Sequence, residues 1–170
     1  MSYCETAYAK INLALHVRCA RNDGYHEIET LFGFVDCGDV LTFKPAVMDS
    51  LNVVGEFASA LSSPNENLIM KLLADYPRLT PFEVTLEKNL PVSAGLGGGS
   101  ADAGAALRIL RRISSTPDDW ENIARRLGAD VPACVASEML LGTGVGHDLG
   151  QVENDLEGMA VLLVIPRLSL

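Results

Sequence analysis

A glycine-rich stretch near the middle of the chain has the composition of a phosphate-binding loop. It reads Pro91-Val92-Ser93-Ala94-Gly95-Leu96-Gly97-Gly98-Gly99-Ser100-Ala101. Glycines let the backbone approach a bulky anion, and their N–H groups can point inward as a nest. A helix starting here would add unpaired amides and the positive end of its dipole, and the Ser100 hydroxyl could contact a phosphate or its Mg²⁺. The stretch therefore predicts a nucleotide-phosphate site, although a tightly packed strand-to-helix turn would use the same glycines.

The loop does not match the two commonest phosphate motifs. The dinucleotide pattern starting at Gly95 requires glycine at the position of Ser100. The P-loop requires a lysine after the glycines, and none follows here. The context favours phosphate binding, because an alternating strand over 82–87 precedes the loop and a helix of small residues over 100–113 follows it.

Two charged residues, far apart in the sequence, could serve a transfer reaction. Lys10 and Asn12 share the polar face of an alternating strand over 10–17, where a lysine could contact a phosphate or a carboxylate. Asp130 follows Gly128 and Ala129 at a helix-cap position, and could act as a general base aimed by Lys10. The simpler interpretations are a solvated strand face and an N-cap. Spacing alone does not show that Lys10 and Asp130 meet.

Further candidates lie near the start of the chain and before a helix. Tyr25 and His26 could stack on a ligand base and hydrogen-bond to it, or could simply form a hairpin turn. Asn67 has the position of a helix cap, and His147 that of an exposed turn residue. Five arginines are expected on solvated helix faces: Arg108, Arg111, Arg112, Arg125 and Arg126.

Composition excludes several classes of protein. The chain has 170 residues, 48% of them hydrophobic, which is enough for one domain with a real core. Its net charge of −9 argues against sequence-independent binding of nucleic acid. The best apolar run, 159–166, is too short to span a bilayer and predicts one buried strand. The four cysteines show no CxxC pair, so we expect reduced thiols in a cytoplasmic protein.

The elements that would position these residues alternate between strands and helices. The hydrophobic pattern predicts strands first and then a strand, the glycine loop and helices, which indicates the α+β class. The predicted strands cover 11–17, 28–34, 40–43, 51–54, 82–87, 139–142 and 160–165. The predicted helices begin near Asn67 and end before Pro77, run over 100–113, and run from a Thr116 cap with Pro117 in first position to Gly128.

Taken together, four segments resemble one family of enzymes. They are Ala9-Lys10-Ile11-Asn12-Leu13, the segment from Asp23-Gly24-Tyr25-His26-Glu27 to Phe32, the glycine loop with its flanks, and Gly128-Ala129-Asp130-Val131-Pro132. The loop resembles that of the GHMP kinases in general. The Asp-Gly-Tyr-His-Glu segment resembles one branch, the 4-diphosphocytidyl-2-C-methyl-D-erythritol kinases of the non-mevalonate isoprenoid pathway.

The resemblance implies a role for each candidate. Residues 91–101 would bind ATP phosphates, with Ser100 near Mg²⁺ and Asn67 near the adenine. Asp130 would take the proton of the substrate hydroxyl, supported by Lys10. Asn12, Tyr25 and His26 would hold the cytidine-bearing substrate.

The resemblance also implies an architecture, which this chain fills only in part. The fold would be the GHMP N-terminal domain, similar to the second domain of the fifth small-subunit ribosomal protein. Family members continue into a second α/β domain, so we expect residues 1–170 to be the N-terminal, ATP-binding part of a longer enzyme. Alternatives are a nucleotide-binding module without turnover and a GHMP kinase for another small alcohol. Ser93, Gly104 and His147 depart from the family pattern.

Overall fold

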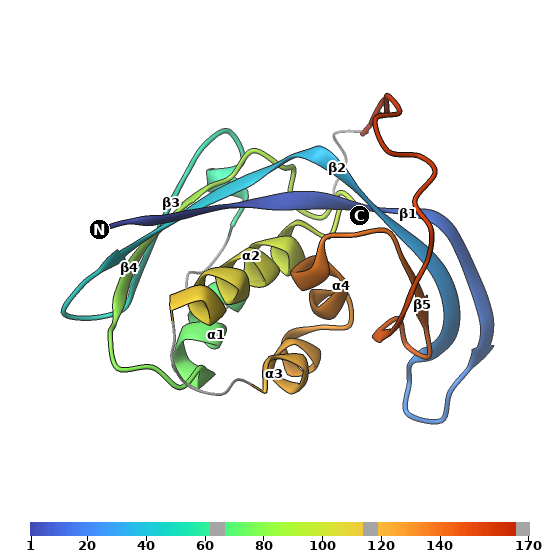
Figure 1. Cartoon of the computed structure of the whole chain (residues 1–170), viewed down its shortest axis with the longest axis horizontal. Coiled ribbons are helices and arrows are strands. Elements are labelled where there is room, and N and C mark those ends of the chain that lie inside the picture. Colours follow the sequence, from blue (N-terminus) through green and yellow to red (C-terminus); the bar gives the residue numbers. More distant parts are fainter. Residues whose placement is uncertain (62–66, 114–118, 166–170) are drawn as a thin grey trace.

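Two long antiparallel strands run through the whole molecule. The computed structural model describes residues 1–61, 67–113 and 119–165, and shows β1 (Tyr3–Ala20) paired along its length with β2 (His26–Pro45) (Figure 1). The sequence predicted separate strands over 28–34 and 40–43, and this was wrong. Gly38 lies within β2, where a Cβ atom would stand 2.3 Å from the Ala7 carbonyl oxygen, so here glycine permits close pairing instead of ending the strand.

β2 is the strand that joins the whole sheet. Its order is β3-β4-β2-β5-β6, and β1 pairs with β2 outside this path. The other strands are β3 (Ser50–Val54), β4 (Phe82–Glu87), β5 (Leu140–Thr143) and β6 (Asp148–Gln151). β4 pairs with residues 40–45 of β2 and β5 with residues 30–32, so the stretch between them has neither neighbour. Asp39, within this interval, accepts hydrogen bonds from the N–H groups of Asn89 and Leu90, which follow β4.

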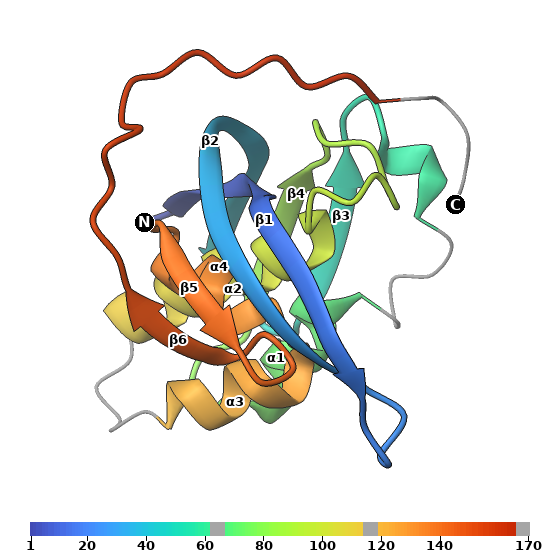
Figure 2. The ribbon, with the colours of Figure 1, turned by 90° about the vertical axis from the view of Figure 1, so that its right-hand side faces the viewer.

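The helices lie together on one face of the sheet (Figure 1). They are α1 (Leu68–Asp75), α2 (Gly98–Ile113), α3 (Trp120–Leu127) and α4 (Val131–Ala136). The 3₁₀ helix η1 (Ala58–Ala60) lies apart from them, beyond β3 (Figure 2). α2 is central, and most of its residues from Ala101 to Leu110 are buried. At Gly104 a Cβ atom would stand 2.7 Å from the Cys134 carbonyl carbon of α4. The family departure at Gly104 therefore lets two helices approach more closely than alanine would allow.

Several predicted helix boundaries are confirmed. The Asn67 side chain accepts a hydrogen bond from the Ile69 N–H at 2.9 Å and caps α1. Gly128 ends α3, donating its N–H to the Ala124 carbonyl at 3.2 Å. The Thr116 and Pro117 start signal lies outside the described residues.

The strand predicted over 160–165 is not formed. This segment pairs with no strand among the described residues, and Leu162 and Val164 are 87% and 82% exposed. Only Leu163 and Ile165 pack onto a small cluster around Ala9 and Leu90. β6, which the sequence did not predict, is the partner of β5 instead. Apolar composition alone did not identify the partner strand.

The far half of β1 extends beyond the helices. Leu13, Leu15 and Val17 are 41%, 54% and 61% exposed, although their alternation predicted a half-buried strand. Figure 2 shows the β1–β2 hairpin projecting from the body at its turn. The alternation is also interrupted, because the pairing register shifts at three places along β1. The periodicity identified the strand but not what covers it.

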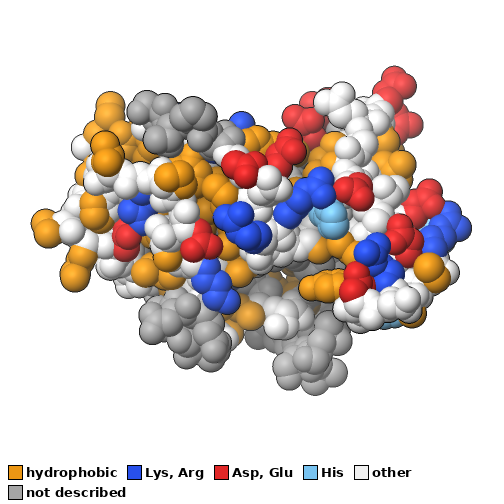
Figure 3. Space-filling view, turned by 90° about the horizontal axis from the view of Figure 1, so that it is seen from below, with side chains coloured by type: hydrophobic (Ala, Val, Ile, Leu, Met, Phe, Trp, Pro, Cys, Tyr) orange, Lys and Arg blue, Asp and Glu red, His pale blue; other side chains and the backbone are white. Residues whose placement is uncertain are grey.

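The surface carries charges of both signs. On the face seen from below in Figure 3, basic and acidic side chains are interleaved instead of forming one basic patch. On this face the acidic and basic side chains of a chain with a net charge of −9 are mixed (Figure 3). None of the described helices is long and apolar enough to cross a membrane.

Candidate active site

The glycine loop connects β4 to α2 and rests on β1. Ser93, Gly95 and Gly97 have positive φ angles of 57°, 75° and 63°, alternating with residues in the ordinary region. Such alternation turns successive N–H groups toward one side, as in an anion-binding nest. The Leu96 carbonyl accepts a hydrogen bond from the Lys10 N–H at 2.9 Å, and a Cβ at Gly97 would stand 3.0 Å from Lys10 Cε. The loop is therefore fixed directly against Lys10.

Lys10 and Asp130 meet beside this loop. Lys10 Nζ lies 3.0 Å from Asp130 Oδ2. The lysine side chain is 6% exposed and the aspartate 33%, so the ammonium is enclosed while the carboxylate is reachable from solvent. Asp130 stands at the N-cap of α4 but makes no capping hydrogen bond with its side chain. The simple N-cap interpretation does not account for this carboxylate, because it is directed to Lys10 instead.

A chain of hydrogen bonds holds the lysine from behind. Lys10 Nζ donates to Asn12 Oδ1 at 2.9 Å, Asn12 Nδ2 donates to Thr30 Oγ1 at 2.7 Å, and the Thr30 hydroxyl donates to the Ala14 carbonyl at 2.8 Å. The Phe32 ring lies under the ammonium, 5.4 Å from Nζ to its centroid. Lys10 is thus not on a solvated strand face, and Asn12 orients it.

The Ser100 hydroxyl, at the start of α2, lies near the backbone of Gly128. A Cβ built at Gly128, two residues before Asp130, would stand 4.0 Å from Ser100 Oγ. Among the described residues no three His, Cys, Asp or Glu side chains gather as metal ligands. The Ser100 hydroxyl suits Mg²⁺ that would arrive bound to phosphates, because this ion keeps several waters and needs few protein ligands.

Sequence reasoning missed a buried ionic cluster beneath the loop. Lys88 Nζ contacts Asp39 Oδ2 and lies 2.9 Å from Asp102 Oδ2, and all three residues are at most 2% exposed. Asp39 Oδ1 also accepts hydrogen bonds from the N–H groups of Asn89 and Leu90, at 2.6 and 2.7 Å. The cluster therefore joins β2 to both ends of the loop. Asp102 among the alanines of a buried helix face was the signal that could have revealed it.

Two groups of this cluster, Asp102 and Lys88, have raised pKa values. Burial raises the pKa of Asp102 to about 7, against the opposing effect of Lys88 and with the Asp39 carboxylate adding to the rise. Burial lowers the pKa of Lys88, but the two carboxylates outweigh it and hold that pKa above its ordinary value. Asp102 Oδ1 has no hydrogen-bond partner among the described residues. The cluster is thus a carboxylate pair sharing one ammonium.

The remaining predicted residues lie farther away. Tyr25 and His26 are exposed at the start of β2, where His26 pairs with Ala20. Ten residues of β1 separate Ala20 from Lys10, roughly 33 Å along the strand. Asn67 lies at the start of α1 and is engaged in capping it. The structure brings together Lys10, Asn12, Asp130 and the loop, and does not place Tyr25, His26 or Asn67 against them.

Comparison with known proteins identifies the class of fold. Residues 66–138 match the family model of the GHMP kinases N terminal domain. The structure superimposes on a homoserine kinase from Cytophaga hutchinsonii with a TM-score of 0.59 over 89% of this chain and 51% of that one, at 17% identity, which supports the fold alone. The α+β fold expected from the sequence is confirmed as that of the GHMP kinase N-terminal domain.

The more similar proteins fall in one branch of this class. The chain is 64% identical, over 98% of its length and 61% of its relative's, to 4-diphosphocytidyl-2-C-methyl-D-erythritol kinase of Erythrobacter litoralis. It is 60% identical to the protein of that name from Novosphingobium aromaticivorans, over 100% of this chain and 60% of the relative. A crystal structure of 4-(cytidine 5'-diphospho)-2C-methyl-D-erythritol kinase matches with a TM-score of 0.73 and 36% identity, over 89% of this chain and 55% of that chain.

These comparisons confirm the resemblance seen in the sequence. The chain is a relative of the 4-diphosphocytidyl-2-C-methyl-D-erythritol kinases and has the GHMP kinase N-terminal fold. It spans about 60% of the length of the curated relatives it matches.

Proposed function

We propose that the full-length protein transfers the γ-phosphoryl group of ATP to the 2-hydroxyl of 4-diphosphocytidyl-2-C-methyl-D-erythritol, a step of the non-mevalonate route to isoprenoid precursors. The observation that carries the proposal is the Lys10–Asp130 pair, 3.0 Å apart beside a loop of alternating backbone handedness. The substrate is supported by two relatives, 64% and 60% identical to this chain, that are named 4-diphosphocytidyl-2-C-methyl-D-erythritol kinase.

In the proposed reaction the carboxylate and the ammonium have different tasks. Asp130, which is partly exposed, accepts the proton as the hydroxyl oxygen attacks the γ-phosphorus, and ADP leaves with the electrons of the broken P–O bond. Lys10 orients this carboxylate and balances negative charge on the transferring group. Catalysis here consists of positioning and charge stabilisation, as is usual for phosphoryl transfer.

The loop would hold the nucleotide. Residues 91–101 would surround the phosphates with N–H groups from the nest and from the first turn of α2. The side chains of Leu96 and Ala101 are buried, so these two residues would contribute backbone alone. Ser100 is the residue that would hold Mg²⁺, and the bound ion would neutralise phosphate charge. Asn67 would lie near the adenine.

The cytidine end of the substrate would extend along the hairpin. Tyr25 and His26 are exposed and free to stack on a base, beside the C-terminal end of β1, where His26 pairs with Ala20. The Asn12 amide is already bonded to Lys10 and Thr30, which leaves it one N–H and one lone pair for a substrate. Asn12 would therefore orient Lys10 and, with its remaining N–H and lone pair, also bind the substrate.

A substrate panel tests the assignment. ADP release from Mg-ATP is measured with 4-diphosphocytidyl-2-C-methyl-D-erythritol, mevalonate and homoserine, each offered separately to the full-length protein. We expect release with the cytidine compound alone. Release with another alcohol would indicate a different GHMP kinase, and nucleotide binding without release would indicate a binding module without turnover.

Replacing the proposed base tests the mechanism. Asp130→Asn should lower kcat by on the order of 10²- to 10⁴-fold while both KM values stay nearly unchanged, because only proton acceptance is lost. Asp155→Asn is the control, since Asp155 is exposed in the segment after β6. Steady-state kinetics measure both variants. Unchanged turnover in Asp130→Asn would remove this carboxylate from the chemistry.

Replacing the histidine of the hairpin tests substrate recognition. His26→Ala should raise the KM for the cytidine substrate on the order of tenfold and leave the KM for ATP unchanged, because one base contact is lost. Isothermal titration with CDP and with ADP separates the two effects. An equal weakening of both ligands would argue against a role in base recognition.

A further inference from the structure

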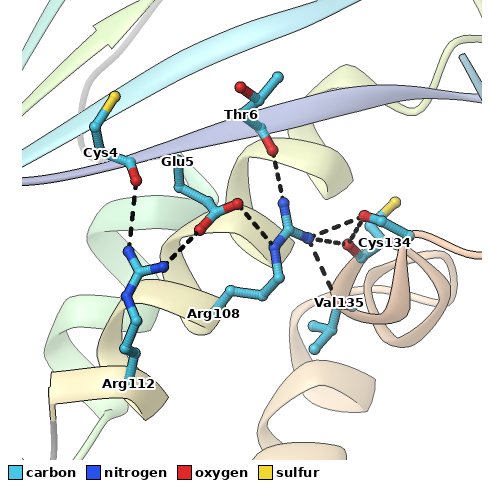
Figure 4. Close-up of polar contacts among 8 residues, drawn as sticks. Cys4, Glu5, Thr6, Arg108, Arg112, Cys134 and Val135 are labelled. Atoms are coloured by element: carbon cyan, nitrogen blue, oxygen red, sulfur yellow. Dashed lines mark hydrogen bonds and ion pairs between the residues drawn. The ribbon is translucent and has the colours of Figure 1, made fainter. Parts of the chain in front are cut away.

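Arg108 joins three elements that surround the proposed reaction centre. It projects from the middle of α2, and its side chain is only 19% exposed, contrary to the solvated helix face expected from the sequence. One Nη donates to the Thr6 carbonyl of β1 at 2.6 Å (Figure 4). The other Nη donates to the Cys134 carbonyl at 2.6 Å and to Ser137 Oγ at 3.0 Å, at the end of α4. The guanidinium is therefore a bridge between β1 and α4.

The same two elements carry Lys10 and Asp130. Thr6 lies four residues before Lys10 on β1, and Asp130 is the residue that precedes α4. α4 has six residues, about 9 Å, and a helix of this length has little stability of its own. β1 and α4 are thus fixed to one another at two points, by Lys10–Asp130 at one end of α4 and by Arg108 at the other. Release of the Arg108 end would let α4 turn about its first residue and so change the orientation of the Asp130 carboxylate.

We propose that Arg108 is a positioning residue that holds Asp130 at its working distance from Lys10 by fixing the far end of α4 to β1. This inference rests on the proposed function, because it concerns the same carboxylate. Arg108 touches neither of the two reacting side chains. It acts through the backbone carbonyls of Thr6 and Cys134, which belong to the elements that carry Lys10 and Asp130.

The chemistry of the bridge requires a guanidinium. Nε lies 3.4 Å from Glu5 Oε1, one Nη contacts β1 and the other contacts α4. A single planar group therefore binds partners on three sides (Figure 4). Lysine has a single terminal nitrogen and cannot span the same partners in this geometry. Arg108→Lys should therefore keep the charge and lose the bridge.

The chain contains a matched control one turn farther along α2. Arg112 faces Glu5 Oε2 at 3.2 Å and the Cys4 carbonyl at 3.4 Å (Figure 4). Both are partners on β1, and no contact between Arg112 and α4 is found among the described residues. Arg112→Met thus removes an arginine from the same helix, next to the same Glu5 side chain. It leaves the Arg108 contacts between β1 and α4 in place.

Steady-state kinetics of the full-length protein test the proposal. Arg108→Met, which retains most of the apolar stem, should lower kcat on the order of 10- to 100-fold with both KM values within about twofold of wild type. Arg108→Lys should behave similarly, and Arg112→Met should match wild type. In the Asp130→Asn background, Arg108→Met should cause no further loss, because the group that it positions is already absent. Amide exchange should quicken in α4 and stay unchanged in α3.

Several outcomes would contradict either the positioning role of Arg108 or the proposed function. An equal loss of kcat in Arg108→Met and Arg112→Met would overturn the positioning role, as would a further loss in the Asp130→Asn background. If Arg108→Met does not fold, Arg108→Lys decides: wild-type kcat per folded molecule would overturn the proposal. Absence of turnover in the wild-type protein would instead overturn the proposed function. Wild-type turnover with an unaffected Arg108→Met variant would overturn the positioning role alone.

Discussion

Charged side chains are arranged differently at the two ends of the β1–β2 pair. Beneath the glycine loop, Lys88, Asp39 and Asp102 are almost wholly excluded from water. At the hairpin turn, Arg21 pairs with Asp23 and Glu27 at 3.0 Å each, with side chains that are 40–49% exposed. The distances are similar, but the surroundings are not.

The surroundings determine what each pair contributes. In the hairpin, hydrogen bonding to Arg21 lowers the pKa of Asp23, yet water screens both groups and hydrates either one when the other is removed. Beneath the loop, removing one charged partner leaves the remaining charges unpaired in the protein interior, which cannot solvate them. The comparison indicates that the buried cluster determines loop structure, whereas the hairpin pairs leave the fold almost unaffected.

Removing the buried ammonium should have the largest effect on stability. Lys88→Met leaves Asp39 and Asp102 together without a cation, and should lower the free energy of unfolding by about 3–5 kcal/mol. Chemical denaturation followed by circular dichroism measures this. Lys44→Met, at an exposed position of β2, is the control and should change stability by less than about 0.5 kcal/mol. Equal effects of the two variants would contradict the comparison.

A smaller, pH-dependent effect should follow from Asp102. Its folded-state pKa is about 7 against an ordinary value of 3.8, so between these values the folded state holds a proton that the unfolded state has lost. Wild-type stability therefore falls as pH rises through this window, and the cost is complete above about 7. Asp102→Asn removes the titration.

Unfolding in denaturant at pH 5 and at pH 8 measures this difference. The stability of Asp102→Asn relative to wild type should improve from the lower pH to the higher, by about 1 kcal/mol or more. Because other titrating groups are shared by both proteins, their contributions cancel. A difference between the proteins that is the same at both pH values would exclude the proposed titration.

The smallest effect is expected at the hairpin. Arg21→Ala removes two exposed ion pairs and should shift the midpoint of thermal unfolding by less than about 2 °C. Differential scanning calorimetry at low and at high salt measures the shift, and salt should reduce it further. The thermal midpoint of Lys88→Met is measured in the same way. If Arg21→Ala shifts the midpoint as much as Lys88→Met does, exposure does not separate the two regions.

The sequence allowed prediction where local chemistry sufficed. Asn67 caps the start of α1 and Gly128 ends α3 through contacts with residues at most four positions away, so short patterns identified both boundaries. The glycine loop was predicted from its composition and its neighbouring elements. The meeting of Lys10 with Asp130 could only be proposed, because it depends on the packing of α4 against β1.

What the sequence did not allow depends on tertiary partners. Arg108 has the same local context as Arg112, yet one side chain reaches α4 and the other does not. The apolar run after residue 158 resembles a strand, but β5 pairs with β6 instead. The site roles of Tyr25, His26 and Asn67 stay predictions, as do those of Lys10, Asn12, Asp130 and the glycine loop.

The contact between Lys10 and Asp130 also constrains when the site can form. The two residues are 120 positions apart, and the loop that rests on Lys10 lies between them in the chain. During synthesis at roughly 5–20 residues per second, Lys10 leaves the ribosome about 6–24 s before its partner. For that interval β1 and β2 can pair while the ammonium has no carboxylate to meet. A nascent chain therefore builds its longest hairpin early and completes its reaction centre only after α4 has emerged.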